Sequence, residues 1–274
     1  MDRGTPTHWD IASEGWLRCS VLYGPFEEPV NNRLIELAEI GTGHTVVDVA
    51  TGIGDPALSV ASRVGPAGRV IATDQSTAML NVAEMRARDR GLTNIEFRQL
   101  DANEFDFPDG TIDAIVCRWG LMFLSDLVDA LRRMRRSLKD GRCLAAATWA
   151  DADKVPVISV RRNTMRAFDI PQGPLDPFRL SSDSALSAAA TSAGFEDVVV
   201  TRSVVPYEYA SADAFASAQR AAHESRLTTL LARTDEQQAE FWRALADAAQ
   251  PYTTAGGVVR MPSEILLMRA RKCR

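Results

Sequence analysis

The sequence predicts an α/β protein with a Rossmann-like, doubly wound sheet that is mostly parallel, has an antiparallel last strand, and carries a helical cap. Two observations lead to this prediction. Apolar runs rich in β-branched residues alternate with amphipathic helical stretches over residues 45–149, and this alternation is typical of parallel sheets covered by helices on both faces. The chain of 274 residues is also long enough for one α/β domain with an inserted cap.

Residues 1–44 precede the first expected strand, and we expect them to form a helical lid segment. They contain Trp9, Trp16 and Tyr23, followed by a helical stretch over residues 29–40. Two glycines directly after this stretch are typical of a helix end.

Residues 45–205 form the predicted core. The expected strands up to this point are 45–50, 69–73, 95–100, 112–117, 142–149 and 198–205, and the expected helices are 56–64, 77–90, 127–138 and 184–193. The first of these helices has Pro56 in its first position and Asp55 as the expected N-cap. The second begins after Ser76 and ends at Gly91.

The remaining segments depart from the regular alternation. Residues 151–180 contain several prolines and are expected to form an insert within the core that is partly helical and partly irregular. Residues 206–258 are expected to form a helical substrate cap with helices over 213–232 and 236–249. Residues 259–274 contain the expected final strand of the core sheet, over 264–270.

The balance of charge and hydropathy excludes several classes of partner. The net charge of −5 gives no electrostatic reason to expect nucleic acid. A cluster of arginines over residues 132–136 fits the solvated face of a helix. No apolar run reaches the roughly 18 residues that a membrane helix needs, and the first residues lack the apolar core of a signal peptide. We therefore expect a cytoplasmic protein, either a monomer or a homodimer.

The cysteines and histidines do not form a recognisable cluster. The four cysteines are widely spaced without a C-x-x-C pattern, and none of the three histidines lies near another or near a cysteine. The sequence therefore predicts neither a disulfide framework nor a metal site.

The most informative segment is VVDVATGIGDP, over residues 46–56, which runs from a buried strand into a helix. Gly52 and Gly54 remove side chains where a ligand must approach the backbone. A tight turn here places a ligand outside the carboxyl ends of the strands. Asp48, near the end of the strand, can receive an ammonium group or orient the loop.

Two further carboxylates follow the next two strands. Asp74 can hydrogen-bond both hydroxyls of a ribose, or it can cap the helix near Ser76. Asp101 can accept a hydrogen bond from the amino group of an adenine. Three such acids fit a cationic ligand that bears an amine, a ribose and an adenine, whereas Asp48 and Asp55 would repel a pyrophosphate. The glycine spacing also fits the G-x-G-x-x-A variant of the dinucleotide fingerprint.

These motifs resemble those of a known family. VVDVATGIGDPAL, IATDQSTAML and LDANEFDFPDGTIDAIV resemble the first three motifs of class I S-adenosylmethionine-dependent methyltransferases, and more closely those of the ubiquinone/menaquinone-biosynthesis C-methyltransferase branch with its methyltransferase type 11-like domain. CRWGLMFLSD and RRSLKDGRCLAAATWA resemble the segments that follow. The resemblance covers roughly residues 45–150. Ala50, where many members have Gly or Cys, and Asp140, where a second Gly is usual, depart from the pattern.

The resemblance implies an enzyme that transfers a methyl group from S-adenosylmethionine to a carbon or oxygen of a small, largely apolar or aromatic molecule. The setting would be secondary-metabolite or quinone-type biosynthesis. The cofactor-binding residues that it implies are Asp48, Ala50, Gly52, Gly54, Asp74, Gln75, Met79, Asp101, Ala102, Arg118 and Trp119. Met79 and Trp119 also fit ordinary packing positions.

Methyl transfer from a sulfonium needs positioning and, for some acceptors, removal of a proton. His223, in the expected cap, is the candidate base, although a half-exposed helix histidine is a common feature. His8 is a weaker candidate for the same role. The candidate substrate residues are Trp16, Tyr23, Phe178, Tyr207 and Trp242, and the alternative for each is a place in the cap's own core.

Two other functions stay open. A protein that binds S-adenosylmethionine without catalysis, as a regulator or scaffold, would keep the same acids. An NAD(P)-dependent oxidoreductase would share the glycine turn, but no Tyr-x-x-x-Lys pair follows the fourth strand.

Overall fold

The computed structural model describes residues 7–173 and 175–273. Residues 1–6, 174 and 274, which belong to the predicted segments 1–44, 151–180 and 259–274, lie outside the described residues. A seven-stranded sheet has the order β3-β2-β1-β4-β5-β7-β6. Its strands are β1 (Thr45–Val49), β2 (Arg69–Asp74), β3 (Ile95–Gln99), β4 (Ile112–Arg118), β5 (Leu138–Trp149), β6 (Glu196–Tyr209) and β7 (Val259–Arg271).

The direction of the strands confirms the predicted fold class. Neighbouring strands from β3 to β5 pair in parallel, and β7 pairs antiparallel with both β5 and β6. β7 is the last strand of the chain, so the prediction of an antiparallel last strand is also confirmed. The parallel strand β1 is buried on both faces, as its continuous apolar run indicates.

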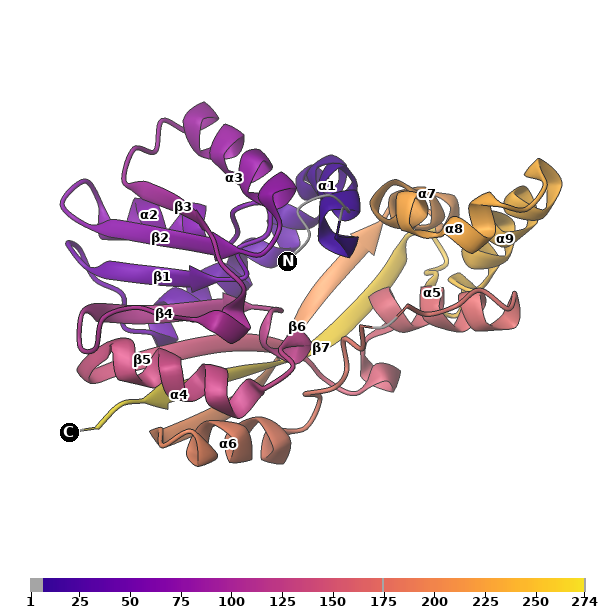
Figure 1. The fold of residues 1–274 in the computed structure, drawn as a ribbon. Coiled ribbons are helices and arrows are strands. Elements are labelled where there is room, and N and C mark those ends of the chain that lie inside the picture. Colours follow the sequence, from indigo (N-terminus) through magenta and orange to yellow (C-terminus); the bar gives the residue numbers. More distant parts are fainter. Residues whose placement is uncertain (1–6, 174, 274) are drawn as a thin grey trace.

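The helices fall into two groups, those that cover the two faces of this sheet and those that lie beyond it at the outer ends of β6 and β7 (Figure 1). They are α1 (His8–Leu37), α2 (Ala57–Val64), α3 (Thr77–Asp89), α4 (Leu127–Ser137), α5 (Pro156–Ala167), α6 (Asp183–Ser192), α7 (Ala212–His223), α8 (Thr228–Leu231) and α9 (Asp235–Asp247). Right-handed connections between parallel strands place α2 and α3 on one face and α4 on the other. α1 packs against α2 and α3, and α4 packs against α6.

The first helix is much longer than the predicted stretch over residues 29–40. α1 begins with a capping box, in which Thr7 and Asp10 exchange hydrogen bonds. It continues through Pro25 and Pro29, although proline normally interrupts a helix. A buried stripe along α1 packs on the core, and this tertiary packing outweighs the backbone hydrogen bonds that the two prolines remove.

The start of α2 also differs from the prediction. The helix begins at Ala57, and Pro56 occupies the cap position without a side-chain hydrogen bond. The Ala57 N–H donates instead to Oδ2 of Asp48 at 2.9 Å. Asp55, the predicted N-cap, forms an ion pair with Arg86 at 2.7 Å. Ser76, in contrast, caps α3 as predicted, because its Oγ accepts a hydrogen bond from the Met79 N–H.

The insertion between β6 and β7 is helical, and both strands extend beyond the rest of the sheet toward its helices (Figure 1). β6 continues to Tyr209, past the predicted boundary at residue 205. The single helix predicted over residues 213–232 is interrupted, since α7 ends at His223 and α8 begins at Thr228. The segment 151–180, predicted as partly helical and partly irregular, contains α5.

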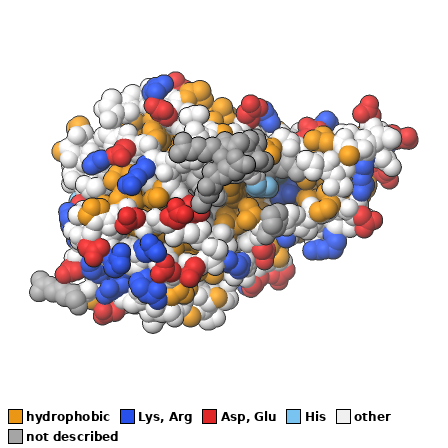
Figure 2. Space-filling model, in the orientation of Figure 1, with side chains coloured by type: hydrophobic (Ala, Val, Ile, Leu, Met, Phe, Trp, Pro, Cys, Tyr) orange, Lys and Arg blue, Asp and Glu red, His pale blue; other side chains and the backbone are white. Residues whose placement is uncertain are grey.

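Basic side chains gather in the lower left of the space-filling view (Figure 2). On α4, Arg132 and Arg136 are exposed, whereas Arg133 and Arg135 are partly buried. Arg132 and Arg133 pair with Asp129, and Arg136 pairs with Asp109. Within residues 7–173 and 175–273, no helix has both the length and the apolar character that a bilayer crossing requires.

Candidate functional site

A cavity of about 670 Å³ opens at the carboxyl ends of the parallel strands. Its wall is formed by the turn after β1, the ends of β2 and β4, the segment after β3, and parts of α1, α5 and α7. This is the edge of an α/β sheet where ligands usually bind, and the volume is that of a small-molecule site.

The two glycines in the turn after β1 have different structural roles. Ala50, Gly52 and Gly54 all have positive φ, at 56°, 56° and 104°. A Cβ built on Gly52 would meet nothing within 4 Å, and Gly52 lines the cavity. A Cβ on Gly54 would lie 3.2 Å from the Leu58 side chain and 3.3 Å from the Cβ of Ala83. Gly54 therefore serves the packing of the helices, whereas Gly52 leaves the backbone open to a ligand.

Asp48 lies beneath this turn and does not line the cavity. Its side chain is fully buried, and Oδ2 accepts hydrogen bonds from Thr51 Oγ1 at 2.6 Å and from Ala57 N. Oδ1 has no hydrogen-bond partner in the part of the chain that the structure describes. Burial raises the pKa of Asp48 to about 7, against the opposing effects of Thr51, Ala57 and Arg118. Of its two expected roles, the structure places Asp48 to orient the loop.

Asp74 joins the turn to the end of β2. Its Oδ2 accepts a hydrogen bond from Gly52 N at 2.8 Å, and its Oδ1 accepts one from Ser76 N at 2.9 Å. Burial raises the pKa of Asp74, while these backbone donors favour its ionised form. Asp74 lines the cavity, and the cap of α3 is Ser76 rather than Asp74. Each carboxylate oxygen keeps acceptor capacity for a ligand hydroxyl.

The other residues expected at this end of the cavity line it as well. They are Gln75, Met79, Asp101 and Ala102. Met79 is also a core residue, 3% exposed, packed with Ala12 and Ile53. Asp101 Oδ1 accepts hydrogen bonds from the backbone and side-chain nitrogens of Asn103 at 2.9 and 2.8 Å, which fixes the carboxylate after β3.

Arg118 is the last residue of β4, Trp119 follows it, and both line the cavity. The Arg118 guanidinium lies 4.6 Å from the Trp119 ring centroid, and the Trp119 ring stacks on Trp149 with centroids 4.5 Å apart. Nε1 of Trp119 and Nε1 of Trp16 are buried without a hydrogen-bond partner among the described residues.

The structure brings together some of the predicted substrate residues. Trp16, Tyr23, Tyr207 and the predicted base His223 line the cavity, as does His8. The Trp16 and His223 rings lie edge to face, with centroids 6.3 Å apart.

Phe178 and Trp242 are not among the residues that line the cavity. Phe178 packs against the main core, and Trp242 packs edge to face on Phe241 within the insertion. Both residues therefore occupy packing positions, which was the stated alternative to a substrate contact.

The same wall contains a polar group that was not predicted from the sequence. Gln219 of α7 accepts a hydrogen bond from Arg161 Nε at 3.1 Å and donates one to the Tyr23 hydroxyl at 3.2 Å. Glu27 of α1 lines the cavity and pairs with Arg118 at 3.1 Å. A continuous α1 would have placed Glu27 and Tyr23 on one face, since they are four residues apart.

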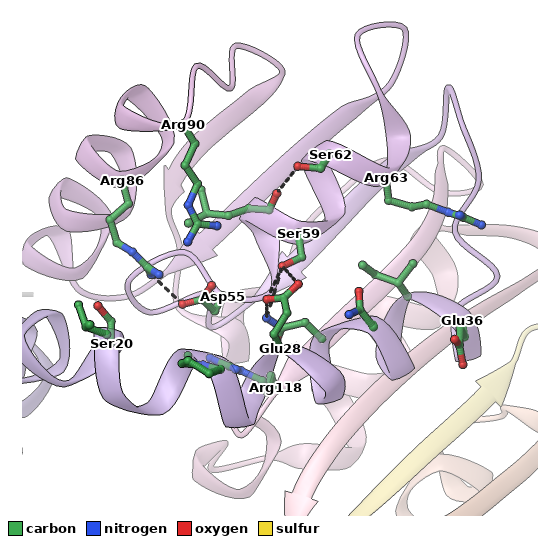
Figure 3. Close-up of a pocket in the computed structure, with 17 residues that line it drawn as sticks. Ser20, Glu28, Glu36, Asp55, Ser59, Ser62, Arg63, Arg86, Arg90 and Arg118 are labelled. Atoms are coloured by element: carbon green, nitrogen blue, oxygen red, sulfur yellow. Dashed lines mark hydrogen bonds and ion pairs between the residues drawn. The ribbon is translucent and has the colours of Figure 1, made fainter. Parts of the chain in front are cut away.

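A second, more open groove of about 1070 Å³ lies beside α1, α2 and α3 (Figure 3). Here Arg86 donates to Asp55 Oδ2 at 2.7 Å and to the Ile53 carbonyl at 2.6 Å. These two hydrogen bonds hold the turn after β1 against α3. Asp55 and Arg118 line both the groove and the cavity.

The model of the ubiE/COQ5 methyltransferase family matches residues 30–157. The ubiquinone/menaquinone biosynthesis C-methyltransferase UbiE of Pseudomonas fluorescens (strain SBW25) is 38% identical over 132 residues, which are 48% of this chain and 52% of that protein. The chain thus spans about half the length of the first curated relatives that it matches. UbiE of Ectopseudomonas oleovorans is 37% identical over 132 residues, covering 48% of this chain and 78% of that protein.

Solved structures share the fold. Phosphoethanolamine N-methyltransferase 2 of Haemonchus contortus, solved with phosphomonomethylethanolamine and S-adenosylhomocysteine, superposes with a TM-score of 0.62 at 17% identity, over 100% of this chain and 60% of that chain. The identity to UbiE of Ectopseudomonas oleovorans, which extends over more than two thirds of that protein, together with the matching family model, shows that the chain belongs to the ubiE/COQ5 methyltransferase family.

Proposed function

We propose that the protein is an S-adenosylmethionine-dependent methyltransferase that methylates a carbon or oxygen of a small, largely apolar or aromatic molecule. The observation that carries the proposal is the hydrogen bond between Gly52 N and Asp74 Oδ2 at the rim of the cavity. It joins a bare backbone turn to a carboxylate at the end of β2, the arrangement that an adenosyl ligand needs. Membership of the family supports the same activity.

The residues of the cavity fit the cofactor. Asp74 would bind the ribose, with Gln75 and Met79 beside the adenine, and Asp101 would accept from the adenine amino group. Ala50, Gly52 and Trp119 would face the methionine part. The cofactor supplies an electrophilic methyl group on a sulfonium, so this chain has to bind it, orient the acceptor and exclude water.

The aromatic wall supports the proposed class of acceptor. The stacked pair Trp119–Trp149, together with Trp16, Tyr23 and Tyr207, offers flat apolar surface beside a few polar groups. The curated relatives carry names from quinone biosynthesis, and we propose quinone-type or secondary-metabolite biosynthesis for this chain. We propose a cytoplasmic monomer or homodimer that acts without nucleic acid.

Asp48 and Asp55 would repel the pyrophosphate of NAD less than the sequence suggested. Asp48 is enclosed beneath the turn, and Asp55 is paired with Arg86, so neither projects an unbalanced charge at a pyrophosphate. The preference for S-adenosylmethionine rests instead on the family and on the carboxylates Asp74 and Asp101 at the cavity.

Calorimetric titration separates these ligands. We expect S-adenosylhomocysteine to bind with micromolar affinity, about 8 kcal/mol, and NAD not to bind. Binding of NAD alone would contradict the proposal. Release of S-adenosylhomocysteine on incubation with S-adenosylmethionine and reduced quinones, phenols or polyketides tests turnover, and tight cofactor binding without turnover on any of them would favour a regulator or scaffold.

A further inference from the structure

Glu27 is a buried carboxylate in the wall of the cavity. It lies in the C-terminal half of α1, its side chain is 10% exposed, and it lines the cavity together with Tyr23 and Tyr207. The described cavity wall contains three other carboxylates, Asp55, Asp74 and Asp101, of which Asp74 ends β2 and the other two lie in the segments after β1 and β3. Glu27 is the one that α1 contributes, and it lies among the aromatic residues rather than beside the glycine turn.

Two groups hold the Glu27 carboxylate in place. Oε1 accepts a hydrogen bond from the Tyr207 hydroxyl at 2.9 Å, and Oε2 lies 3.1 Å from Arg118 Nη1. Each carboxylate oxygen has two acceptor positions, so each oxygen can accept one further hydrogen bond. Because Glu27 lines the cavity, a molecule that fills the cavity can supply that donor.

A structural explanation accounts for only part of this arrangement. The Glu27–Arg118 pair does tie α1 to the end of β4. A buried ion pair, however, stabilises a fold no better than well-packed apolar residues of similar volume. A buried ionisable group that faces a ligand cavity is a candidate for chemistry.

We propose that Glu27 accepts the proton that the acceptor loses on methylation, an inference that rests on the proposed function. The acceptor's O–H or C–H bond breaks, and the electrons of the acceptor form the new bond to the methyl carbon. The methyl–sulfur bond breaks with its electrons left on sulfur, so the sulfonium becomes a neutral thioether. The proton passes to a Glu27 oxygen, and the carboxylate becomes a carboxylic acid.

The charged and titratable groups around Glu27 suit this role. Burial raises the pKa of Glu27, and so does the nearby charge of Asp55 in the turn, while Arg118 and the Tyr207 hydroxyl lower it. Tyr23, four residues earlier on α1, also faces this cluster. The net result is a pKa above the ordinary glutamate value, which makes the carboxylate a better proton acceptor.

The first experiment compares Glu27→Gln with Glu28→Gln. Glu28 is the next residue of the same helix, but it accepts hydrogen bonds from Ser59 Oγ in the groove of Figure 3. Both variants remove one negative charge. We expect Glu27→Gln to lower kcat by about 100-fold or more, as loss of a general base does, and Glu28→Gln to leave kcat unchanged. The probes are 1,4-naphthohydroquinone and 2-naphthol, with release of S-adenosylhomocysteine as the readout.

Glu27→Gln leaves the Arg118 charge buried without its partner, and this can unfold the protein. Glu27→Asp is the second variant, because it keeps the charge and draws the carboxylate back by one methylene. We expect its Tm and its affinity for S-adenosylhomocysteine to match the wild type while turnover falls. A variant with lowered Tm and cofactor affinity but wild-type turnover would instead identify Glu27 as a structural anchor.

The pH profile separates Glu27 from His223. The base acts in its ionised form, so wild-type kcat should rise with pH through the pKa of Glu27. This rise should disappear in Glu27→Gln and persist in His223→Gln. Tyr207→Phe removes a hydrogen bond that favours the ionised carboxylate, so it should move the rise to higher pH.

A last measurement needs no turnover. Binding of 2-naphthol to the S-adenosylhomocysteine complex should weaken as the pH falls through the Glu27 pKa, because its hydroxyl then loses a charged acceptor. In Glu27→Gln the affinity should not depend on pH. A wild-type affinity without this dependence, or no binding of 2-naphthol at all, would overturn the inference about Glu27. Failure to bind S-adenosylhomocysteine would instead contradict the proposed function.

Discussion

Asp48 combines complete burial with hydrogen bonds to only one of its two oxygens among the described residues. Its pKa in the folded chain is about 7, against an ordinary value of 3.8. Between these two values the folded chain binds a proton that the unfolded chain releases. The free energy of unfolding therefore falls as the pH rises through this range. The stabilisation that comes from the protonated form of Asp48 is lost above about pH 7.

Asp48→Asn removes this titration and keeps an oxygen that can accept from Thr51 and Ala57. From about pH 5 to about pH 8, the free energy of unfolding should fall more in the wild type than in the variant, by about 2 to 3 kcal/mol. Urea denaturation at several pH values measures the difference. Asp140→Asn, at an exposed position, is the control and should follow the wild type. Parallel profiles for the wild type and Asp48→Asn would contradict the raised pKa.

Local signals in the sequence were sufficient for part of the site. The positions of Asp74 and Asp101 after strands, and of Gly52 in the turn, follow from the order of elements along the chain, and all three line the cavity. The different tasks of Gly52 and Gly54 could not be inferred, because only the contacts with Leu58 and Ala83 distinguish them. Glu27 was missed because nothing local shows that Arg118 and Tyr207 come together around it.

At the scale of elements, α1 and α3 are joined at their N-termini. Asp10 Oδ2 accepts hydrogen bonds from Thr7, and Asp10 Oδ1 accepts from Ser76 Oγ and from Ala78 N in the first turn of α3. The Asp10 carboxylate thus caps α1 and also binds the first turn of α3. Ser76 N in turn donates to Asp74, so this link supports the carboxylate proposed to bind the ribose.

Asp10→Ala should therefore weaken cofactor binding from a distance. Loss of a helix cap costs about 1 kcal/mol, and we expect about fivefold weaker binding of S-adenosylhomocysteine by calorimetry. Asp126→Ala removes the cap of α4, where Asp126 Oδ1 accepts from Asp129 N. We expect Asp126→Ala to lower Tm about as much as Asp10→Ala does, but to leave the affinity for S-adenosylhomocysteine unchanged. Equal affinities for Asp10→Ala and the wild type would show that the two helix ends act independently of the cofactor site.

The same scale shows where sequence patterns fail. The core strands were predicted to within a few residues, except that β5 begins at Leu138 rather than at residue 142. α1 was cut short because Pro25 and Pro29 are local breakers, whereas its stability comes from tertiary burial. β6 and β7 were predicted too short for a related reason, because their outer halves pair with each other beyond the main sheet, from Val204 opposite Glu264 to Tyr209 opposite Val259.

At the scale of the whole molecule, the cavity joins two parts with different origins. The end of the cavity proposed to bind the cofactor is formed by residues at the ends of the strands, within the segment that matches the family model, residues 30–157. Its other wall comes from α1, α5 and α7, largely outside that segment. The sequence could therefore predict the cofactor end by resemblance, whereas the proposed acceptor end depends on how three distant helices pack.

This division predicts that the two functions can be damaged separately. Gln219 links Arg161 of α5 to Tyr23 of α1 through its own two hydrogen bonds. Gln219→Leu keeps the volume but removes both bonds, each worth about 1 kcal/mol, so the acceptor KM should rise by up to about 30-fold while the affinity for S-adenosylhomocysteine stays unchanged. Asp101→Ala should do the reverse, because Asp101 lies at the cofactor end. Steady-state kinetics and calorimetry on both variants check this. If either variant changed both quantities together, the cavity would act as one unit, and the division between cofactor and acceptor ends would be wrong.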